Sequence, residues 1–438
     1  MKRFQSLMTA AGRMADPAGG GAPSGGLVLG RLAFLIAFVG LKVVALFGML
    51  WLARVASPEV FGGIELAISV GLIVVGVGLL GVPGGVTRLA LALDEPLIGD
   101  HLSFAALCIA GPATVAAVVG LVIGAPPVAV LIPAVCAVTS FQSSGSTFAR
   151  IRARPMLNSI IDPLPVLSIL AIAGGLWAAG RLNLPSLALG VTILAGVLST
   201  ALLIGFIRNR RPDFLVAYRR ALGISLPLLA LSGVAMIVGA GLRPLLGVRF
   251  SLADLALYSL CFRLCAPSML MHQILGTAFF ARIYKAADHN FDRVAAGLMG
   301  ACVLTVIAIW LALPPLVGFV FPTYIPALPG LTVLFPLVGL QVILWILIAF
   351  LEMKVGRHAV ATGASIAGYV IFGAFALAFS VLPVDTLLRA TLLFDVALAA
   401  FAVSQLILLH RRAVKLPLIR GVLPLVGLVC GALVMLAR

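Results

Sequence analysis

The sequence predicts an all-α, polytopic membrane protein with 12–13 transmembrane helices. Three observations lead to this fold class. First, 62% of the 438 residues are hydrophobic and only 10% are charged, whereas a soluble globular protein has about 25% charged residues. Second, the apolar residues form long continuous runs. Third, the basic residues gather in the loops between those runs. So few charges cannot cover the surface of a water-soluble protein.

The apolar runs give the individual helices. A transmembrane helix needs about 20 apolar residues, and thirteen runs approach or exceed that length. The last is the shortest, so it either crosses the membrane or lies along its surface. The runs are 32–52, 62–82, 102–123, 128–148, 156–179, 184–207, 222–242, 252–280, 294–321, 331–351, 359–382, 387–409 and 422–437.

Composition also divides the chain into four parts. Residues 1–26 are small and polar, which predicts a flexible cytoplasmic tail or, alternatively, a short interfacial helix. No apolar signal-peptide core follows the first basic residues. The longest basic loop separates an N-lobe, 27–212, from a C-lobe, 213–410. Residues 411–438 hold a basic segment and an additional C-terminal helix.

The charge distribution predicts the orientation. Lys and Arg number 30 and Asp and Glu 14, giving a net charge of +16. With the N-terminus in the cytoplasm and thirteen spans, the main basic loops fall on the cytoplasmic side, as the positive-inside rule requires. This explains the basic composition without a nucleic-acid partner. The loops are 150–154, 208–220, 282–293 and 411–415.

Two outer hairpins suggest a repeat. Ser57 and Glu59 precede the second apolar run, and Ser251 and Asp254 begin the eighth. The two hairpins are six helices apart, so the repeats would share one orientation and be related by a pseudo-two-fold axis along the membrane normal. Chance similarity between two short hairpins is the alternative.

Signatures of enzymes and of metal sites are missing from the sequence. It contains no phosphate-binding loop, no His-Glu-x-x-His motif, and no Cys/His cluster with metal-ligand spacing. The adjacent carboxylates Asp94 and Glu95 fall in a cytoplasmic loop, where solvation explains them better than catalysis. The outer loops are too short to carry catalytic residues. We therefore expect neither an enzyme nor a cofactor or metal.

Several charged residues lie within the apolar runs, where each costs about 2.5–3.5 kcal/mol on insertion scales. We expect one of three roles. They form interhelical ion pairs; or Lys42 and Arg263 line a hydrated cavity for an anionic ligand; or the acids couple transport to protons or cations. These residues are Lys42, Glu65, Asp162, Arg263 and Asp395, with the uncharged His272 at depth.

Two further arginines lie at helix ends. Arg88 follows a Pro-Gly-Gly break after the second run, and Arg243 ends the seventh run. Each is either an anchor that extends to the interface or part of a basic track along the cavity.

Four segments carry a family resemblance. Residues 52–62 with the helix up to Arg88, and residues 249–259, 277–284 and 321–324, resemble polysaccharide-biosynthesis (Wzx-type) flippases of the multidrug/oligosaccharidyl-lipid/polysaccharide exporter superfamily. The resemblance implies two six-helix lobes forming a V around a cationic cavity. It also implies export of undecaprenyl-diphosphate-linked glycan across the bacterial inner membrane for O-antigen, capsule or exopolysaccharide. A glycan polymerase and other assembly proteins would be partners. The thirteenth run departs from the family's twelve-helix pattern.

The resemblance bears on the site residues as well. Lys42 and Arg263 are similar in kind to the basic cavity residues of these flippases, and Arg88 and Arg243 would extend that set. A diphosphate carries about two negative charges, and moving both outward through 100 mV gains roughly 5 kcal/mol. The alternatives are a cation-coupled multidrug antiporter of the same superfamily and, less favoured, a membrane glycan polymerase or glycosyltransferase.

Overall fold

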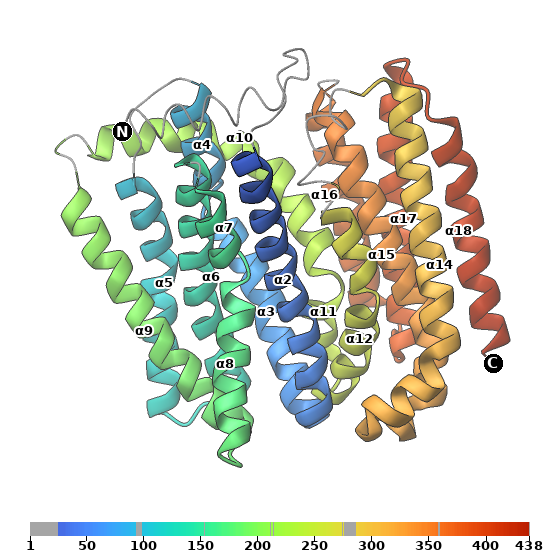
Figure 1. Ribbon diagram of the computed structural model, residues 1–438, viewed down its shortest axis with the longest axis horizontal. Helices are drawn as coiled ribbons and strands as arrows, with labels where there is room; N and C mark the ends of the chain where they lie inside the picture. The colour runs from blue at the N-terminus through green and yellow to red at the C-terminus, as the bar shows by residue number, and fades with distance from the viewer. Residues whose placement is uncertain are drawn as a thin grey trace.

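The computed structural model describes residues 25–92, 99–152, 154–210, 212, 214–273, 275, 286–357 and 360–437. Throughout these residues the regular structure is helical (Figure 1). The tail before residue 25, the Asp94-Glu95 pair and the 277–284 motif lie outside the described residues.

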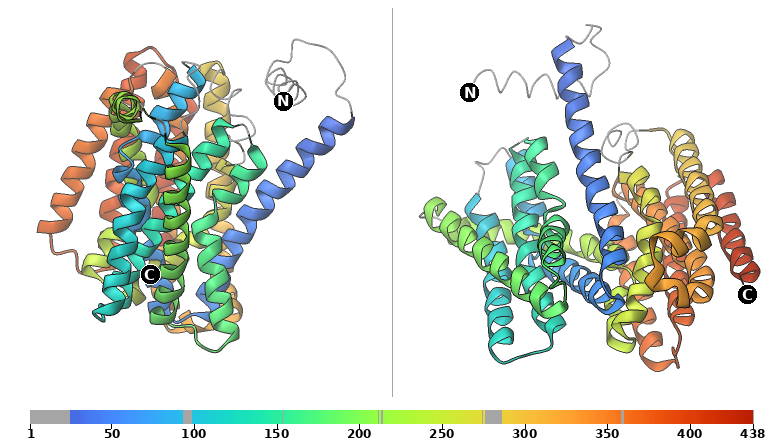
Figure 2. Two further views of the ribbon diagram at one scale, coloured as in Figure 1. Left: turned by 90° about the vertical axis from the view of Figure 1, so that its left-hand side faces the viewer. Right: turned by 60° about the horizontal axis from the view of Figure 1, so that its bottom comes forward.

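The first half of the chain forms a bundle that we call the N-lobe. Its helices are α2 (Gly25–Val55), α3 (Pro58–Gly78), α4 (Val82–Ala92), α5 (Gly99–Val122), α6 (Pro127–Ile151), α7 (Pro155–Ile161), α8 (Leu164–Ala178) and α9 (Leu184–Asn209). Helices α5, α6 and α9 pack on one another, and α3 packs on α6. Helix α2 leans away from the other helices toward its N-terminal end (Figure 2).

We call the helices of the second half the C-lobe; among them, α15 packs against α14, α17 and α18. Its helices are α10 (Phe214–Ala240), α11 (Arg243–Arg249), α12 (Leu252–Leu264), the short helix Ala266–Gln273, α14 (Asp288–Val320), the 3-10 helix η1 (Pro322–Ala327), α15 (Leu328–Arg357), α16 (Ala361–Val381), α17 (Leu387–Arg411) and α18 (Pro417–Leu436).

The helices confirm the predicted polytopic membrane protein. Nine described helices are long and apolar enough to cross a bilayer. The number is ten if α12 and the short helix Ala266–Gln273, which meet at a bend of 47°, are counted together as one span. Helices α2 and α10, with 31 and 27 residues, occupy the first and seventh runs. Helices α7 and α8 share the fifth.

Two features differ from or sharpen the expectation. Helix α4 was not predicted, because the Pro-Gly-Gly stretch at 83–85 suggested a break. The chain instead turns just before this stretch, at Leu80 and Gly81, which have φ values of 51° and 71°. Helix α4 then begins at Val82. The last run forms α18, whose 20 residues are long and apolar enough to cross. Helix α2 begins at one end of the bundle and α18 ends at the other (Figure 1).

The lobes meet along α3 and α4. Helix α3 packs against α10, α11 and α12, and α4 packs against α10. A Cβ atom at Gly62 would overlap the carbonyl oxygen of Leu252, and one at Gly81 would lie 2.5 Å from the carbonyl oxygen of Ser225. These glycines let backbones of different lobes touch, as small residues do between membrane helices. The pseudo-two-fold repeat and the central cavity stay predictions.

Candidate functional site between the lobes

Two similarly capped helices bring the site together. The Ser57 hydroxyl accepts a hydrogen bond from the Val60 N–H (3.4 Å) and caps α3. The Ser251 hydroxyl accepts one from the Asp254 N–H (3.1 Å), and the Asp254 carboxylate accepts the Ser251 N–H, which completes a capping box on α12. Because α3 and α12 cross close to these caps, residues two or three turns further along each helix face the other lobe.

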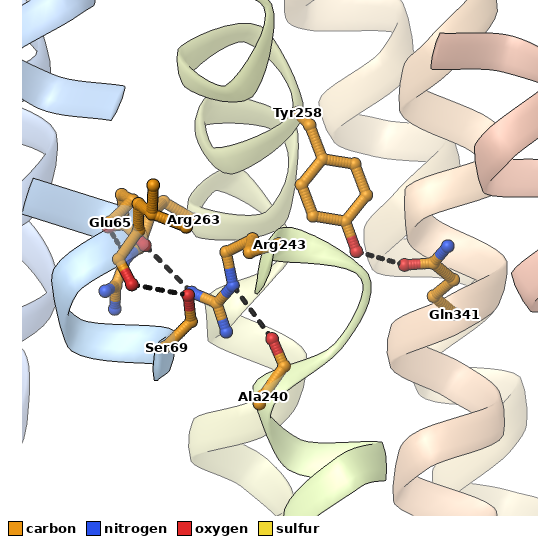
Figure 3. Close-up of polar contacts among 8 residues, drawn as sticks. Glu65, Ser69, Ala240, Arg243, Tyr258, Arg263 and Gln341 are labelled. Atoms are coloured by element: carbon orange, nitrogen blue, oxygen red, sulfur yellow. Dashed lines mark hydrogen bonds and ion pairs between the residues drawn. The ribbon is translucent and has the colours of Figure 1, made fainter. Parts of the chain in front are cut away.

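Two to three turns beyond the caps, one carboxylate contacts two guanidinium groups (Figure 3). The Arg243 Nη1 donates to Glu65 Oε2 at 2.8 Å, and the Arg263 Nε donates to Glu65 Oε1 at 2.7 Å. Glu65 is on α3 in the N-lobe, whereas both arginines are in the C-lobe. We call these three residues the Glu65 cluster. It joins the lobes through charge-assisted hydrogen bonds.

Local contacts hold Arg243 more firmly than Arg263. The Nε of Arg243 donates to the Ala240 carbonyl oxygen (3.1 Å), and its guanidinium carbon lies 4.4 Å from the centre of the Phe262 ring. Arg243 is therefore fixed by its own turn, by a cation–π contact and by Glu65. The Arg243 side chain is buried inside the protein. It therefore does not act as an anchor that extends to the membrane–water interface.

The Glu65 cluster carries an excess positive charge. Two guanidinium groups, which stay protonated in proteins, share one carboxylate, so the formal sum is +1. The Glu65 side chain is 0% exposed and the Arg263 side chain 16%. Among the described residues, no partner is seen for the two terminal nitrogens of Arg263. The cluster can therefore offer N–H donors to an anion while Glu65 holds the Nε.

Lys42 and Asp162 form a different kind of pair. The Lys42 Nζ lies 2.5 Å from Asp162 Oδ2 and joins α2 to the junction of α7 and α8, within the N-lobe. Their side chains are 21% and 35% exposed. Their charges balance, so this pair is neutral, unlike the Glu65 cluster.

A second polar centre lies inside the C-lobe. Tyr258 donates to Gln341 Oε1 at 2.5 Å, and the Gln341 amide donates to the Thr391 carbonyl oxygen at 3.4 Å (Figure 3). Asp395 lies one turn beyond Thr391 on α17 and is buried. Neither of its carboxylate oxygens has a hydrogen-bond partner in the described part of the chain. A buried carboxyl group in this state is a candidate for protonation.

The remaining predicted residues lie elsewhere. His272 is in the short helix after α12, where its ring packs 5.4 Å from Trp345 and 5.2 Å from Phe350 between centroids. Arg88 belongs to α4, but its side chain lies outside the described residues. The structure thus brings together Glu65, Arg243 and Arg263. The described residues contain no group of three or more His, Cys, Asp or Glu side chains arranged for a metal.

The sequence analysis missed two buried polar contacts in the C-lobe. Lys354 lies in α15, beyond the apolar run 331–351, and its ammonium contacts Asp288 Oδ1 (3.1 Å) and the Phe291 ring. Asp292 of α14 accepts the backbone N–H groups of Leu418 and Ile419 at 2.8 and 2.9 Å, and so caps α18. Both contacts join segments far apart in sequence, so only the presence of a charge next to an apolar run could have suggested them.

A known structure shares this arrangement of helices. The lipid II flippase MurJ in an inward closed conformation matches 93% of this chain and 98% of its own, with a TM-score of 0.60 and 11% sequence identity. The chain has the fold of this flippase. An inward-facing multidrug resistance MATE family transporter of the MOP superfamily matches 84% of this chain and 92% of its own, at 13% identity and a TM-score of 0.47. No protein-family model and no curated protein matches the sequence.

Proposed function

We propose that this protein is a flippase that moves a polyprenyl-diphosphate-linked oligosaccharide across the bacterial inner membrane by alternating access. The observation that carries the proposal is the Glu65 cluster, which places an excess positive charge between the lobes and leaves donors on Arg263. The shared fold with a lipid II flippase supports the same class of substrate. The carrier is undecaprenyl diphosphate, and the N-terminus is cytoplasmic.

The chemistry of a diphosphate suits these groups. Its oxygens are strong acceptors, and a guanidinium group presents planar, paired donors to them. Arg263 offers its two terminal nitrogens, and Arg243 adds charge at short range. Lys42 and Arg88 are the further basic residues of the proposed substrate path, and Lys42 would contribute when its contact with Asp162 opens.

The same cluster suggests how the lobes respond to substrate. A diphosphate on the terminal nitrogens of Arg263 would share the positive charge of that guanidinium with Glu65, so binding weakens one of the two bonds that join α3 to the C-lobe. Asp395 is our first candidate for coupling to protons or cations, since its carboxyl group is buried without a partner. Glu65, Asp162 and His272 are the other candidates.

The test is the lipid pool of a strain that lacks the protein. Mass spectrometry should show complete polyprenyl-diphosphate glycan accumulating on the cytoplasmic side, with loss of the exported glycan. Wild-type protein should restore export, and Arg263→Gln should not. Arg389→Gln is the matched control, because Arg389 is exposed and pairs only locally with Asp385 (2.8 Å).

Other outcomes would identify the alternatives. An unchanged lipid pool with new sensitivity to cationic drugs would make the protein a multidrug antiporter, which the positive cluster disfavours. Exported single repeat units that fail to lengthen would indicate a glycan polymerase and contradict the proposal.

A further inference from the structure

A second site lies in the N-lobe, away from the Glu65 cluster. A cavity of about 510 Å³ opens among α5, α6, α7 and α9, at the end of the bundle that carries the basic 150–154 loop. Its volume is within the usual range of small-molecule pockets. None of the three residues of the Glu65 cluster lines it. The polar lining residues are Asp100, Ser103, Ser144, Arg152 and Asn209.

Asp100 supplies the most buried polar group of the lining. It lies in the first turn of α5 and is 1% exposed. Its Oδ1 accepts the His101 backbone N–H at 3.0 Å and lies 2.9 Å from the His101 ring Nδ1. Its Oδ2 has no hydrogen-bond partner among the described residues. Leaving a buried acceptor unpaired costs about 1–3 kcal/mol, and more for a charged group, so this oxygen favours a ligand that brings a donor.

Arg152 supplies the opposite charge. It follows the end of α6 and is exposed, and its guanidinium carbon lies 5.5 Å from the centre of the Phe148 ring, which also lines the cavity. No ion pair joins Arg152 to an acid in the described part of the chain. The cavity thus presents a buried acceptor, a cation and apolar walls from Phe141, Leu157 and Ile161.

We propose that this cavity binds the headgroup of an aminophospholipid of the inner leaflet. A primary ammonium group donates to Asp100 Oδ2, the phosphate meets Arg152, and the first carbons of the acyl chains lie on the apolar wall. A choline headgroup has no N–H to donate, and a glycerol headgroup brings no cation. Because basic loops lie at the headgroup level of the cytoplasmic leaflet, the cavity is at the right depth for a headgroup.

The bound lipid would also act on the junction between the lobes. His101, whose ring is tied to Asp100, packs 5.1 Å from Phe214 and 5.6 Å from Tyr218 between ring centroids. Both partners are on α10, the helix that enters the C-lobe and contacts α4. A ligand that orders Asp100 therefore steadies the packing of α10 on the N-lobe.

The test is binding of defined lipids to the full-length protein in detergent, followed by native mass spectrometry and by thermal unfolding. The probes are short-chain phosphatidylethanolamine, its mono-, di- and trimethylated forms, and phosphatidylglycerol. We expect wild-type protein to bind phosphatidylethanolamine about tenfold more tightly than the trimethylated form, as for loss of one charged hydrogen bond. Phosphatidylglycerol should bind weakly as well.

Variants assign the preference to the cavity. Asp100→Asn should abolish the preference for the primary amine. Arg152→Gln should weaken the binding of all the phospholipids to the same extent. Arg154→Gln is the matched control, because Arg154 is exposed on the same loop and does not line the cavity. Asp385→Asn controls for loss of a carboxylate, because Asp385 is in another part of the fold.

Three results would overturn the proposal. The first is equal binding of the primary and trimethylated headgroups by wild-type protein, a measurement that needs no variant. The second is an unchanged preference in Asp100→Asn. The third is equal stabilisation by sodium ion or free phosphoethanolamine, which would make the site one for a cation or a soluble amine. None of these experiments uses a glycan substrate, so they stand apart from the test of transport.

Discussion

Helices α3 and α12 are a near-matched pair that differs in charge. Their capping residues Ser57 and Ser251 have almost the same backbone angles, φ −66° and ψ 155° against φ −68° and ψ 159°. Eight residues past the cap, α3 has Glu65 where α12 has a serine. Twelve residues past the cap, α12 has Arg263 where α3 has a serine. Each helix thus carries one charge at a position where the other carries a hydroxyl.

This difference shows how two similarly capped helices can join the lobes. Two identical helices crossing at this depth would present equal charges to each other and repel. Placing the acid on one helix and the base on the other makes the contact complementary, and the additional Arg243 leaves the positive excess. The capping geometry is shared by the two helices, whereas the charges that join the lobes are specific to each one.

Removing the acid of the Glu65 cluster should lower the stability of the protein more than any other change we propose. Glu65→Gln leaves the buried Arg243 and the partly buried Arg263 without a counter-charge, and loss of one partner from a buried pair costs about 3–5 kcal/mol. Thermal unfolding in detergent measures the change. Glu59→Gln, an exposed first-turn acid on the same helix, is the control. Equal stability of the two variants would contradict the role of the Glu65 cluster as a link.

Forcing apart the backbones of α3 and α12 should have the next largest effect on stability. Gly62→Ala puts a Cβ where the Leu252 carbonyl oxygen lies, and overpacking costs typically about 1–3 kcal/mol. Gly175→Ala, at a position in α8 with open space around it, should be neutral or slightly stabilising by comparison. Cross-linking of cysteines introduced on α3 and α12 would detect the separation. An unaltered cross-linking yield in Gly62→Ala would show that the contact is not tight.

The two caps should differ in strength. Ser251 has a complete capping box at 3.1 Å, whereas Ser57 makes a single bond at 3.4 Å. We expect Ser251→Ala to cost about 1 kcal/mol of unfolding free energy, and Ser57→Ala to cost less. Chemical denaturation of both variants alongside wild type measures the difference. A larger loss in Ser57→Ala would reverse the ranking that the geometry predicts.

The smallest effect on stability is expected at Lys42. Its ion pair with Asp162 is partly exposed, whereas Glu65 is fully buried between two guanidinium groups, so we expect the loss of this pair to cost less than the loss of Glu65. Lys42→Gln should therefore unfold close to the wild-type temperature, far from Glu65→Gln. Added salt should reduce even this small difference. A loss as large as that of Glu65→Gln would show that Lys42 has a structural role comparable to the link between the lobes.

Much of this architecture follows from local sequence. Each of the thirteen apolar runs contains helix, because a bilayer allows few other backbone structures across it. Glu65, Arg263 and Arg243 attracted notice for the same reason, since a charge in or at the end of an apolar run is costly. Their pairing could not be predicted. Glu65 lies 178 residues from Arg243 and 198 from Arg263, and no local pattern specifies such contacts.

The acidic partners of Lys42 and Arg263 show the limit most clearly. Both are bases within apolar runs, and the sequence offered several acids for each. The structure places Asp162 beside Lys42 and Glu65 beside Arg263, which depends on how α2 leans and where α12 crosses α3. These are properties of packing between distant segments, so they appear only in three dimensions.

The contact between Asp292 and the start of α18 has a practical consequence for measuring the distance between the two lobes. Two backbone N–H groups of α18 donate to one carboxylate of α14, and α18 also packs on α15, so the final helix is attached to the C-lobe. Cys108 on α5 is exposed, whereas the other five cysteines are buried. A spin label on that native thiol, paired with one engineered near Leu436, would therefore report the distance between the two lobes directly. Electron paramagnetic resonance on frozen samples with and without the proposed substrate would then measure any change in that distance.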